Sequence, residues 1–410
     1  MPFLPKTYLA LFKNRDFFIL SAIIFFCQAA SAFLVLTLII SVFLKTGSNI
    51  GVSGVVLSFT IPSFFLMAFS GLLADIFDRR KTIIFANVFI TLVVLMIIYT
   101  QKAVYASIPL SFLYFAGNSF FIPASSAATA QLVKKNELLV ANSIFIFNLA
   151  GGVLLGLFAA AVVYFFFGAY VTLVICEVFL LVAAVLSFFL PKLVPLEKSE
   201  DSFRKRVSNI WDGFVYMFKS RTVWFFFVAF AAIQGVIVFG ITLAPGFFTE
   251  IVGISIEKAL VFVFPLITVG VLFGIGVINK PKINELSLLS LGNLVMGASL
   301  FFYGISLKIQ LFSRLALAFL AVPFLIGLGF GTILIMIASR TVLQKKIPHT
   351  HQGTVFGANI ILASLFAAFA SPLAVMFEVI FGYLGTLVLG GTALGFSGAL
   401  FIYLGKKWKY

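Results

Sequence analysis

Long apolar runs separated by short polar stretches extend over most of the chain. Each run holds roughly 18–27 residues, and an α-helix that rises about 1.5 Å per residue needs roughly 20 of them to cross about 30 Å of hydrocarbon. Strands of a membrane barrel would instead alternate over about ten residues. The pattern therefore predicts transmembrane helices, and the predicted spans are residues 17–43, 50–74, 83–101, 104–129, 141–166, 168–190, 222–248, 256–279, 286–306, 313–338, 353–380 and 382–404.

The longest polar stretch, residues 191–221, divides these spans into two sets of six. We therefore expect an all-α membrane protein with twelve transmembrane helices in two pseudo-symmetric six-helix bundles, residues 1–190 and 222–410. Within the linker, residues 203–219 place apolar side chains at helical spacing beside four basic residues. That pattern is typical of an amphipathic helix on the cytoplasmic membrane surface, and a solvated linker with a few apolar anchors is the alternative.

Two halves with equal numbers of spans indicate an internal duplication, and some residues recur in equivalent places. Gln28 and Phe33 of the first span match Gln234 and Phe239 of the seventh at a constant offset of 206 residues. Paired lysines also follow the fourth and the tenth spans. Parallel halves related by an axis along the membrane normal are one of the known constructions of transporters.

The composition indicates that lipid, rather than water, surrounds most of the chain. Of the 410 residues, 62% are hydrophobic and only 10% are charged. A water-soluble domain cannot hide so much apolar surface, because its area-to-volume ratio forces polar side chains outward. The two cysteines, Cys27 and Cys176, both fall inside predicted spans, where we expect small core residues rather than a disulfide.

The basic residues behind the formal net charge of +15 are concentrated in the segments predicted to lie in the cytoplasm. With the N-terminus in the cytoplasm, the cytoplasmic segments hold 23 of the 28 Lys and Arg residues and nine acids, a net charge of +14, and the rest carries +1. By the positive-inside rule, this predicts a multi-pass protein of the plasma (inner) membrane with both termini cytoplasmic and no nucleic-acid partner. Residues 1–16 have no cleavage-type site, so we expect the first span to be retained.

The loop after the second predicted span carries a dense motif. Residues 71–81 read Gly-Leu-Leu-Ala-Asp-Ile-Phe-Asp-Arg-Arg-Lys. The motif resembles the signature of the major facilitator superfamily between its second and third spans, glycine-x-leucine-alanine-aspartate followed by a basic cluster. Its Asp-x-x-Asp-Arg-Arg-Lys form is similar to the branch that contains macrolide-efflux and enterobactin-exporter proteins. The resemblance implies a secondary transporter that works by alternating access and, in this branch, an exporter or antiporter of small molecules.

The resemblance also implies that this motif acts as a latch on the cytoplasmic side. Gly71 would allow close helix approach, and Asp75, at a helix end, is placed to meet the positive N-terminus of another helix. A basic cluster that only sets the topology is the alternative. The predicted gate motif consists of Gly71, Asp75, Asp78, Arg79, Arg80 and Lys81.

Three positions depart from the family pattern. Ile76 replaces a basic residue of the loop, and Tyr114 stands where related exporters carry an arginine in the fourth span. Val153 replaces the proline of the antiporter glycine motif in the fifth span. We still expect the glycines of that motif to allow tight helix packing, namely Gly151, Gly152 and Gly156.

Glu177 is the clearest ionisable residue inside a predicted span, about nine residues into the sixth. A charge in mid-membrane is costly, so such a residue is a functional candidate by default. Protonation would remove most of that cost, which suits a proton carrier. A structural hydrogen bond or a protonated acid facing lipid is the alternative, because the sixth span of this family is usually a peripheral support helix.

In the family, the first, fourth, seventh and tenth spans line the central cavity. Carried over to this chain, that implies a polar lining of Gln28, Asn118 and Gln234, with Tyr114 among the aromatic residues beside it. An apolar cavity with few polar groups suits a hydrophobic or amphipathic ligand better than a sugar or a phosphate. Simple packing is the alternative for most of the aromatic side chains.

Other chemistry has little support in the sequence. The only histidines, His349 and His351, lie in a predicted loop without nearby cysteines or clustered acids, which favours a solvated loop over a metal site. Neither a phosphate-binding glycine loop nor an intramembrane protease motif occurs. We therefore expect no enzyme activity and no cofactor, and we expect a small-molecule substrate, membrane lipids and protons as partners. A lysophospholipid flippase and a non-transporting membrane sensor of the same fold are the alternatives.

Overall fold

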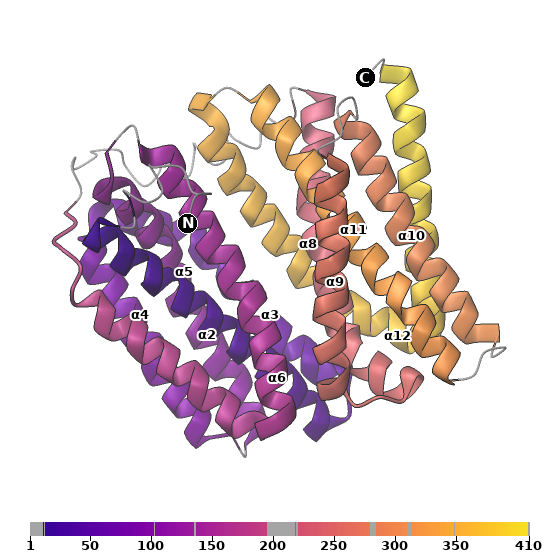
Figure 1. The fold of residues 1–410 in the computed structure, drawn as a ribbon, viewed down its shortest axis with the longest axis horizontal. Helices are drawn as coiled ribbons and strands as arrows, with labels where there is room; N and C mark the ends of the chain where they lie inside the picture. Colours follow the sequence, from indigo (N-terminus) through magenta and orange to yellow (C-terminus); the bar gives the residue numbers. More distant parts are fainter. Residues whose placement is uncertain are drawn as a thin grey trace. The chain divides into compact units, whose positions relative to one another are not determined.

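The computed structural model describes residues 11, 13–101, 103–134, 137–194, 218, 220–278, 284–309, 314–347 and 349–408. All regular structure in these ranges is helical (Figure 1). The predicted all-α class is confirmed. The predicted amphipathic helix of the linker falls almost wholly on residues outside the described ranges, so it stays a prediction.

The chain divides into two compact units. Unit 1 comprises Met1–Gly47 and Gly54–Arg206, and unit 2 comprises Ser48–Ser53 and Val207–Tyr410. The division after residue 206 falls inside the predicted linker, while a short segment at residues 48–53 clusters with unit 2 instead of unit 1. The predicted domain boundaries at residues 190 and 222 stay predictions.

Unit 1 is built around one helix. The helix α2 packs against α5 and α6, and α4 packs against the same two helices (Figure 1). Most residues of α2 are buried, which agrees with a central position in the bundle. The helices of this part of the chain are α2 (Arg15–Thr46), α3 (Asn49–Ile76), α4 (Arg79–Tyr99), α5 (Val104–Leu132) and α6 (Leu138–Ser187).

Local signals fix the two ends of α2. The Asn14 side chain accepts a hydrogen bond from the Phe17 N–H and so satisfies one of the free donors at the start of the helix. Gly47 has φ of 61° and donates its N–H to the Phe43 carbonyl. A left-handed glycine after the last helical residue is a common helix stop, because other residues adopt that conformation at a cost. The helix therefore extends a few residues beyond the predicted apolar span 17–43 at both ends.

Two long helical runs are interrupted at a glycine. In α6, which covers 50 residues, Gly168 has φ of 74° and ψ of −176°. In α12 (His349–Trp408), which covers 60 residues, Gly382 has φ of 65° and ψ of 172°. Neither conformation belongs to an α-helix. Each run is therefore two helices joined at a glycine, at the places where the sequence predicts the boundaries between spans 141–166 and 168–190 and between spans 353–380 and 382–404.

Unit 2 is also a helical bundle. The helix α8 packs against α11 and α12, α10 packs against the same two helices, and α9 packs against α11. Glycines allow close approach here, since a Cβ added at Gly297 of α10 would collide with Gly391 and Gly395 of α12. The other elements of this unit are α8 (Arg221–Gly246), the π-helical η2 (Phe247–Val252), α9 (Ile256–Ile278), α10 (Glu285–Ile309) and α11 (Arg314–Lys346).

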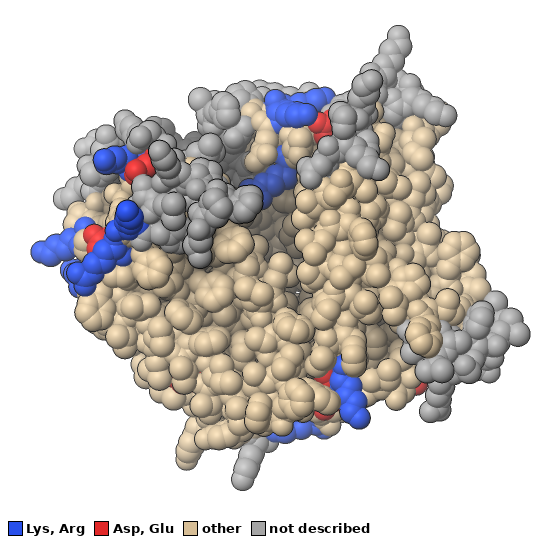
Figure 2. Space-filling view, viewed as in Figure 1, with Lys and Arg blue, Asp and Glu red and all other residues tan. Residues whose placement is uncertain are grey.

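Nine helices among the described residues are long and apolar enough to cross a membrane, and α6 and α12 each count once in that number. Large apolar side chains are exposed on many of them, among them Phe85, Phe166 and Phe369. On the face that Figure 2 shows, charged side chains gather near the helix ends and uncharged residues cover the middle. Exposed apolar surface of this extent is what a lipid environment accommodates.

Candidate functional site

The described part of the predicted gate motif forms the start of α4. Asp78 is the N-cap residue of this helix, and its Oδ1 accepts the Arg80 N–H at 2.9 Å. The Asp78 carbonyl accepts the Thr82 N–H at 3.0 Å, which closes the first helical turn. The cap places the three basic residues of the motif in that turn. Basic residues are unfavourable beside a helix N-terminus, so contacts with other parts of the chain are expected to compensate.

Two such contacts come from the end of α6 and from the residues that follow it. The Arg80 Nη2 atom donates to the Phe188 carbonyl at 2.6 Å, and the Arg79 N–H donates to the Leu193 carbonyl at 3.2 Å. Phe188 is the C-cap residue of α6, where unsatisfied carbonyls carry partial negative charge. Arg80 therefore caps α6 and joins it to α4 within unit 1.

The remaining gate residues are placed less completely. Lys81 is exposed in the first turn of α4. Gly71 and Asp75 belong to α3, and their side chains lie outside the part of the chain that the structure describes. The proposed pairing of Asp75 with another helix is therefore a hypothesis on the motif alone.

A buried polar chain crosses the core of unit 1. The Cys27 thiol donates to Asn87 Oδ1 at 3.2 Å, and the Asn87 side-chain amide donates to Ser187 Oγ at 2.7 Å. These contacts connect α2, α4 and α6. The Cys176 thiol donates to the Ala30 carbonyl at 3.2 Å, so both cysteines are free, buried and hydrogen-bonded. Asn87 is not among the residues predicted from the sequence, although an amide inside the predicted span 83–101 was a signal for it.

Tyr114 lies fully buried in the same core. Its hydroxyl is 2.9 Å from Ser31 Oγ, and Ser31 Oγ also donates to the Cys27 carbonyl at 3.0 Å. A buried tyrosine hydroxyl usually finds such a partner, because an unpaired one costs free energy. Tyr114 therefore links α5 to α2 in this chain.

Glu177 lies in α6 beside this core. It is 5% exposed, and neither carboxyl oxygen has a hydrogen-bond partner among the described residues. A buried carboxyl without a partner is unusual and is a candidate for binding and releasing a proton.

Three amide side chains of unit 1 have a buried polar atom without a hydrogen-bond partner among the described residues. Gln28 of α2 is 9% exposed and Asn118 of α5 is 7% exposed, and the side-chain oxygen of each is buried without a hydrogen-bond partner among the described residues. Asn148 of α6 has a buried Nδ2 atom in the same situation. Asn148 is not among the residues predicted from the sequence, although it is an amide inside the predicted span 141–166. Buried polar atoms of this kind are candidates for contacting water or a ligand.

The glycines of the predicted antiporter motif differ in their packing. A Cβ added at Gly152 would lie 2.8 Å from Gln28 Cβ, and one at Gly156 would lie 2.9 Å from Ala29 Cα. At Gly151, by contrast, an added Cβ would meet only the Phe147 ring of its own helix, at 3.8 Å. Gly152 and Gly156 therefore permit close approach between α6 and α2, and Gly151 does not take part in it.

In unit 2, Gln234 is half-buried in α8, next to Gly235, which packs on Phe366 of α12. A separate polar cluster gathers at Tyr383. The Asn49 Nδ2 atom donates to Glu378 Oε2 and to the Tyr383 hydroxyl, both at 2.8 Å. The Tyr383 hydroxyl in turn donates to Glu250 Oε1 at 3.4 Å. Two carboxylates thus converge on one amide and one phenol.

The described residues contain no group of three or more His, Cys, Asp or Glu side chains that could hold a metal ion. One ion pair in them joins Lys345 Nζ to Glu285 Oε1 at 2.6 Å, between the end of α11 and the start of α10. Since Lys345 is largely exposed, we expect this pair to contribute only about 0–1 kcal/mol.

Solved structures show the same fold at low sequence identity. A variant of the nucleoside transporter NupG is similar with a TM-score of 0.72 and 14% identity, over 94% of this chain and 100% of that chain. A POT family transporter in complex with a thioalcohol-conjugated peptide gives 0.74 and 12%, over 96% of each chain. The POT family transporter PepTSo gives 0.72 and 14%, over 100% of this chain and 99% of that chain. Among curated protein sequences, none matches this chain.

The likeness to these structures establishes the fold, and the family follows from the sequence. The family model described as Major Facilitator Superfamily matches residues 18–372, which is most of the chain. Its members are membrane transporters rather than enzymes. This chain belongs to the major facilitator superfamily.

Proposed function

We propose that this protein is a secondary active transporter that exports hydrophobic or amphipathic small molecules by alternating access. Family membership is the observation that supports a transport function, because the match extends over residues 18–372. The export direction rests on the motif at residues 71–81, whose form is similar to that of efflux proteins. A drug-like, macrolide-like or siderophore-like molecule would be the substrate.

We propose twelve transmembrane spans in total. Nine described helices are long and apolar enough to cross a membrane. Because α6 and α12 are each interrupted at a glycine, they supply two spans each. The helix α5, with 29 residues, is long enough to cross as well. The basic residues then favour a plasma-membrane (inner-membrane) protein with both termini in the cytoplasm.

The proposed substrate contacts are Gln28, Tyr114, Asn118 and Gln234. Two of these, Gln28 and Asn118, have unused amide oxygens, which supports a role as hydrogen-bond acceptors for a ligand. None of the four side chains is charged. A peptide has charged termini and would need ionic partners, so a ligand with few polar groups agrees better with this set.

We propose Glu177 as the proton carrier if transport is coupled to protons. Its support is the combination of deep burial and two carboxyl oxygens without partners among the described residues. A proton that binds there would neutralise the carboxyl and remove the cost of holding a charge in an apolar environment.

A lipid flippase with the same fold is the second candidate. The same lack of charged groups among the proposed contacts also suits the acyl chain of a lysophospholipid. A sensor that binds a ligand without moving it is the third candidate, and the arginine-to-tyrosine difference at Tyr114 supports it.

Reconstitution into liposomes tests these candidates together. Lipophilic cations, antibiotics, siderophores and labelled lysolipids would be offered with and without an imposed pH gradient. We expect movement of lipophilic molecules that increases when the gradient is imposed. Movement of lysolipids alone would favour the flippase, and binding without any movement would favour the sensor and overturn the proposal.

A further inference from the structure

The buried asparagine and glutamine side chains of the described residues fall into two groups. Three of them, Gln28, Asn118 and Asn148, make no side-chain hydrogen bond to a described residue. The others are hydrogen-bonded, namely Asn49, Asn87, Asn293 and Asn359. Buried amides are normally paired, because an unpaired one has lost its contacts with water and gained none in return. The three unpaired amides therefore need a partner that the chain itself does not supply.

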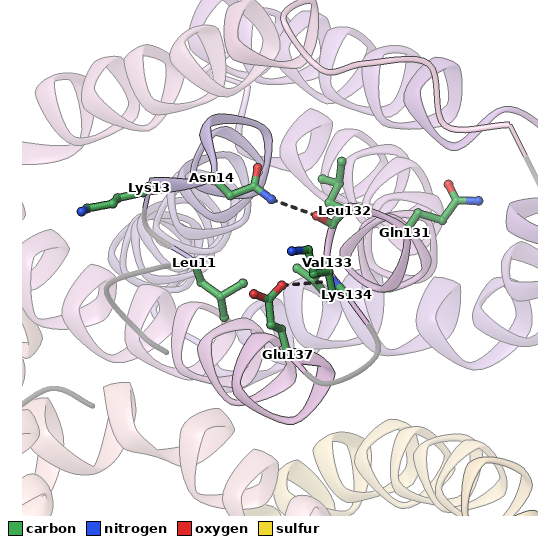
Figure 3. A pocket seen from close by; sticks show the side chains of 8 residues that line it. All are labelled: Leu11, Lys13, Asn14, Gln131, Leu132, Val133, Lys134 and Glu137. Atoms are coloured by element: carbon green, nitrogen blue, oxygen red, sulfur yellow. Dashed lines mark hydrogen bonds between the residues drawn. The ribbon is translucent and has the colours of Figure 1, made fainter. Parts of the chain in front are cut away.

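Two contacts show how α2 and α5 are aligned. The Asn14 Nδ2 atom, at the start of α2, donates to the Leu132 carbonyl at the end of α5, at 2.9 Å (dashed line in Figure 3). Near the middle of both helices, the hydroxyl oxygens of Ser31 and Tyr114 lie 2.9 Å apart. Low residue numbers of α2 thus pair with high residue numbers of α5, so the two helices are antiparallel.

This alignment places Gln28 level with Asn118. The two residue numbers in each contact add up to 145 or 146, so residue 28 of α2 is level with residues 117 and 118 of α5. Gln28 comes three residues before Ser31, and Asn118 comes four residues after Tyr114. Residues three or four apart share one face of a helix, so both amides belong to the faces that meet at the Ser31–Tyr114 contact.

The third amide comes from α6. A Cβ added at Gly152 would lie 2.8 Å from Gln28 Cβ, so α6 packs on α2 at this residue. Asn148 is one turn before Gly152 on the same face of α6. The unpaired amides therefore come from three helices at neighbouring levels of unit 1. Each of the three residues retains between 7% and 9% exposure, so solvent reaches all of them.

Aromatic rings accompany two of these amides. Phe25 is three residues from Gln28 on α2. Phe115 is three residues from Asn118 on α5. Residues at this spacing are neighbours on a helix surface, and both rings are only half-buried. The three helices therefore offer neutral hydrogen-bonding groups beside aromatic surface.

The chemistry of the amide group indicates what would satisfy this set. A carboxamide has two N–H donors and a carbonyl acceptor and carries no charge. A ligand with donors alone or acceptors alone would satisfy only part of each amide. A charged ligand that leaves water needs an ion of opposite sign, which an amide does not provide. A neutral molecule with adjacent donors and acceptors therefore agrees best with three amides.

We propose that Asn148 contacts the substrate together with Gln28 and Asn118, and that the substrate is a neutral aromatic molecule with adjacent amide and hydroxyl groups. This inference rests on the proposed function, because it names the ligand class of the same transport site. Hydroxyl and N–H groups of the ligand donate to the oxygens of Gln28 and Asn118, and Asn148 donates to a ligand carbonyl. The ligand ring packs beside Phe25 and Phe115.

Direct binding to the purified full-length protein tests the ligand class separately from transport. Chloramphenicol is the probe, because it is neutral and joins an aromatic ring to an amide and two hydroxyl groups. Its diacetyl ester keeps the ring and the amide but has lost both hydroxyl donors. We expect saturable binding of chloramphenicol in equilibrium dialysis and about tenfold weaker binding of the diester. This assay detects binding even if the protein moves no solute across a membrane.

Matched variants assign the binding to the amides. Asn148→Leu keeps a similar side-chain volume but removes the donors and the acceptor, so we expect the affinity for chloramphenicol to fall about tenfold. The Tm of the ligand-free protein should rise, because an apolar group replaces an unpaired buried polar one. Asn118→Leu should act in the same way. Asn142→Leu, at an exposed amide of the same helix α6, is the control and should leave the affinity unchanged.

Three results would overturn the inference. An absence of saturable chloramphenicol binding would exclude the ligand class. Unchanged affinity in Asn148→Leu would mean that this amide contacts water only. A lower Tm together with weaker binding in Asn148→Leu would mean that the amide supports the fold. If chloramphenicol bound in the expected pattern but was not moved across liposomes, the proposed function would fail and the binding site would stand.

Discussion

The hydroxyl oxygens of Ser31 and Tyr114 lie 2.9 Å apart in the buried core of unit 1. Ser31 Oγ also donates to the Cys27 carbonyl of its own helix. The Tyr114 side chain of α5 is therefore connected through Ser31 to the backbone of α2. Gln28 is one turn away from Ser31 on α2, and Asn118 is one turn away from Tyr114 on α5. We expect this pair to stabilise the rotation of both helices, and with it the direction of the two proposed substrate contacts.

Removing the Tyr114 hydroxyl tests how much this pair stabilises the fold. Tyr114→Phe keeps the ring and its packing but loses one buried hydrogen bond, which we expect to cost about 0.5–1.5 kcal/mol of stability. Thermal unfolding in detergent would measure the loss. Ser31→Ala should cost a similar amount, and the double variant should cost less than the sum, because both changes remove the same contact. Fully additive losses would show that the two hydroxyls act independently.

The N-cap of α4 gives a second prediction. Asp78 Oδ1 accepts the Arg80 N–H, and asparagine has an equivalent oxygen at that position. We therefore expect Asp78→Ala to lower stability by about 1 kcal/mol and Asp78→Asn to be nearly neutral. Both variants would be compared by thermal unfolding and by transport. Equal stability of the alanine variant and the original protein would contradict the capping role, and loss of transport in the asparagine variant alone would indicate that the charge serves the gate.

The sequence predicted the class of the fold because long apolar runs admit one solution in lipid, and the breaks at Gly168 and Gly382 agree with the predicted ends of the neighbouring spans. Hydropathy could not predict how far α2 extends, since Asn14 and Gly47 stop it with capping contacts rather than with a change in polarity. It also could not predict that Asn87 bonds Cys27 and Ser187. Such partners depend on the rotation of each helix, which a pattern of apolar residues leaves open.

The gate hypothesis makes a prediction about Asp75. Asp75→Asn keeps the size of the side chain but removes the charge that would meet a helix N-terminus. We expect transport in proteoliposomes to fall by about tenfold, equivalent to about 1.4 kcal/mol, while the amount of protein inserted in the membrane changes little. Insertion would be measured by the yield of extracted, folded protein. Efflux at the original rate would exclude Asp75 from the latch.

Proton coupling makes a prediction about Glu177. Glu177→Gln removes the only titratable group of that side chain, so transport should lose its dependence on pH and on an imposed pH gradient. Glu177→Asp keeps a carboxyl and should keep a pH dependence, although the shorter side chain is expected to shift it. Initial rates across a pH series would be measured for both variants. A glutamine variant with the original pH profile would assign the coupling proton to another group.

Helix packing gives a prediction with a control five residues away on the same helix. A Cβ at Gly156 would lie 2.9 Å from Ala29 Cα and 3.0 Å from the Ala29 carbonyl oxygen, and neither backbone atom can move without displacing α2. An added Cβ at Gly151 meets only the flexible Phe147 ring, at 3.8 Å. We therefore expect Gly156→Ala to destabilise the protein by about 1–3 kcal/mol through overpacking, and Gly151→Ala to be neutral or slightly stabilising. Thermal unfolding of the two variants in one detergent would decide. Similar stabilities for both would mean that α6 and α2 are not in close contact at Gly156 in the membrane-embedded protein.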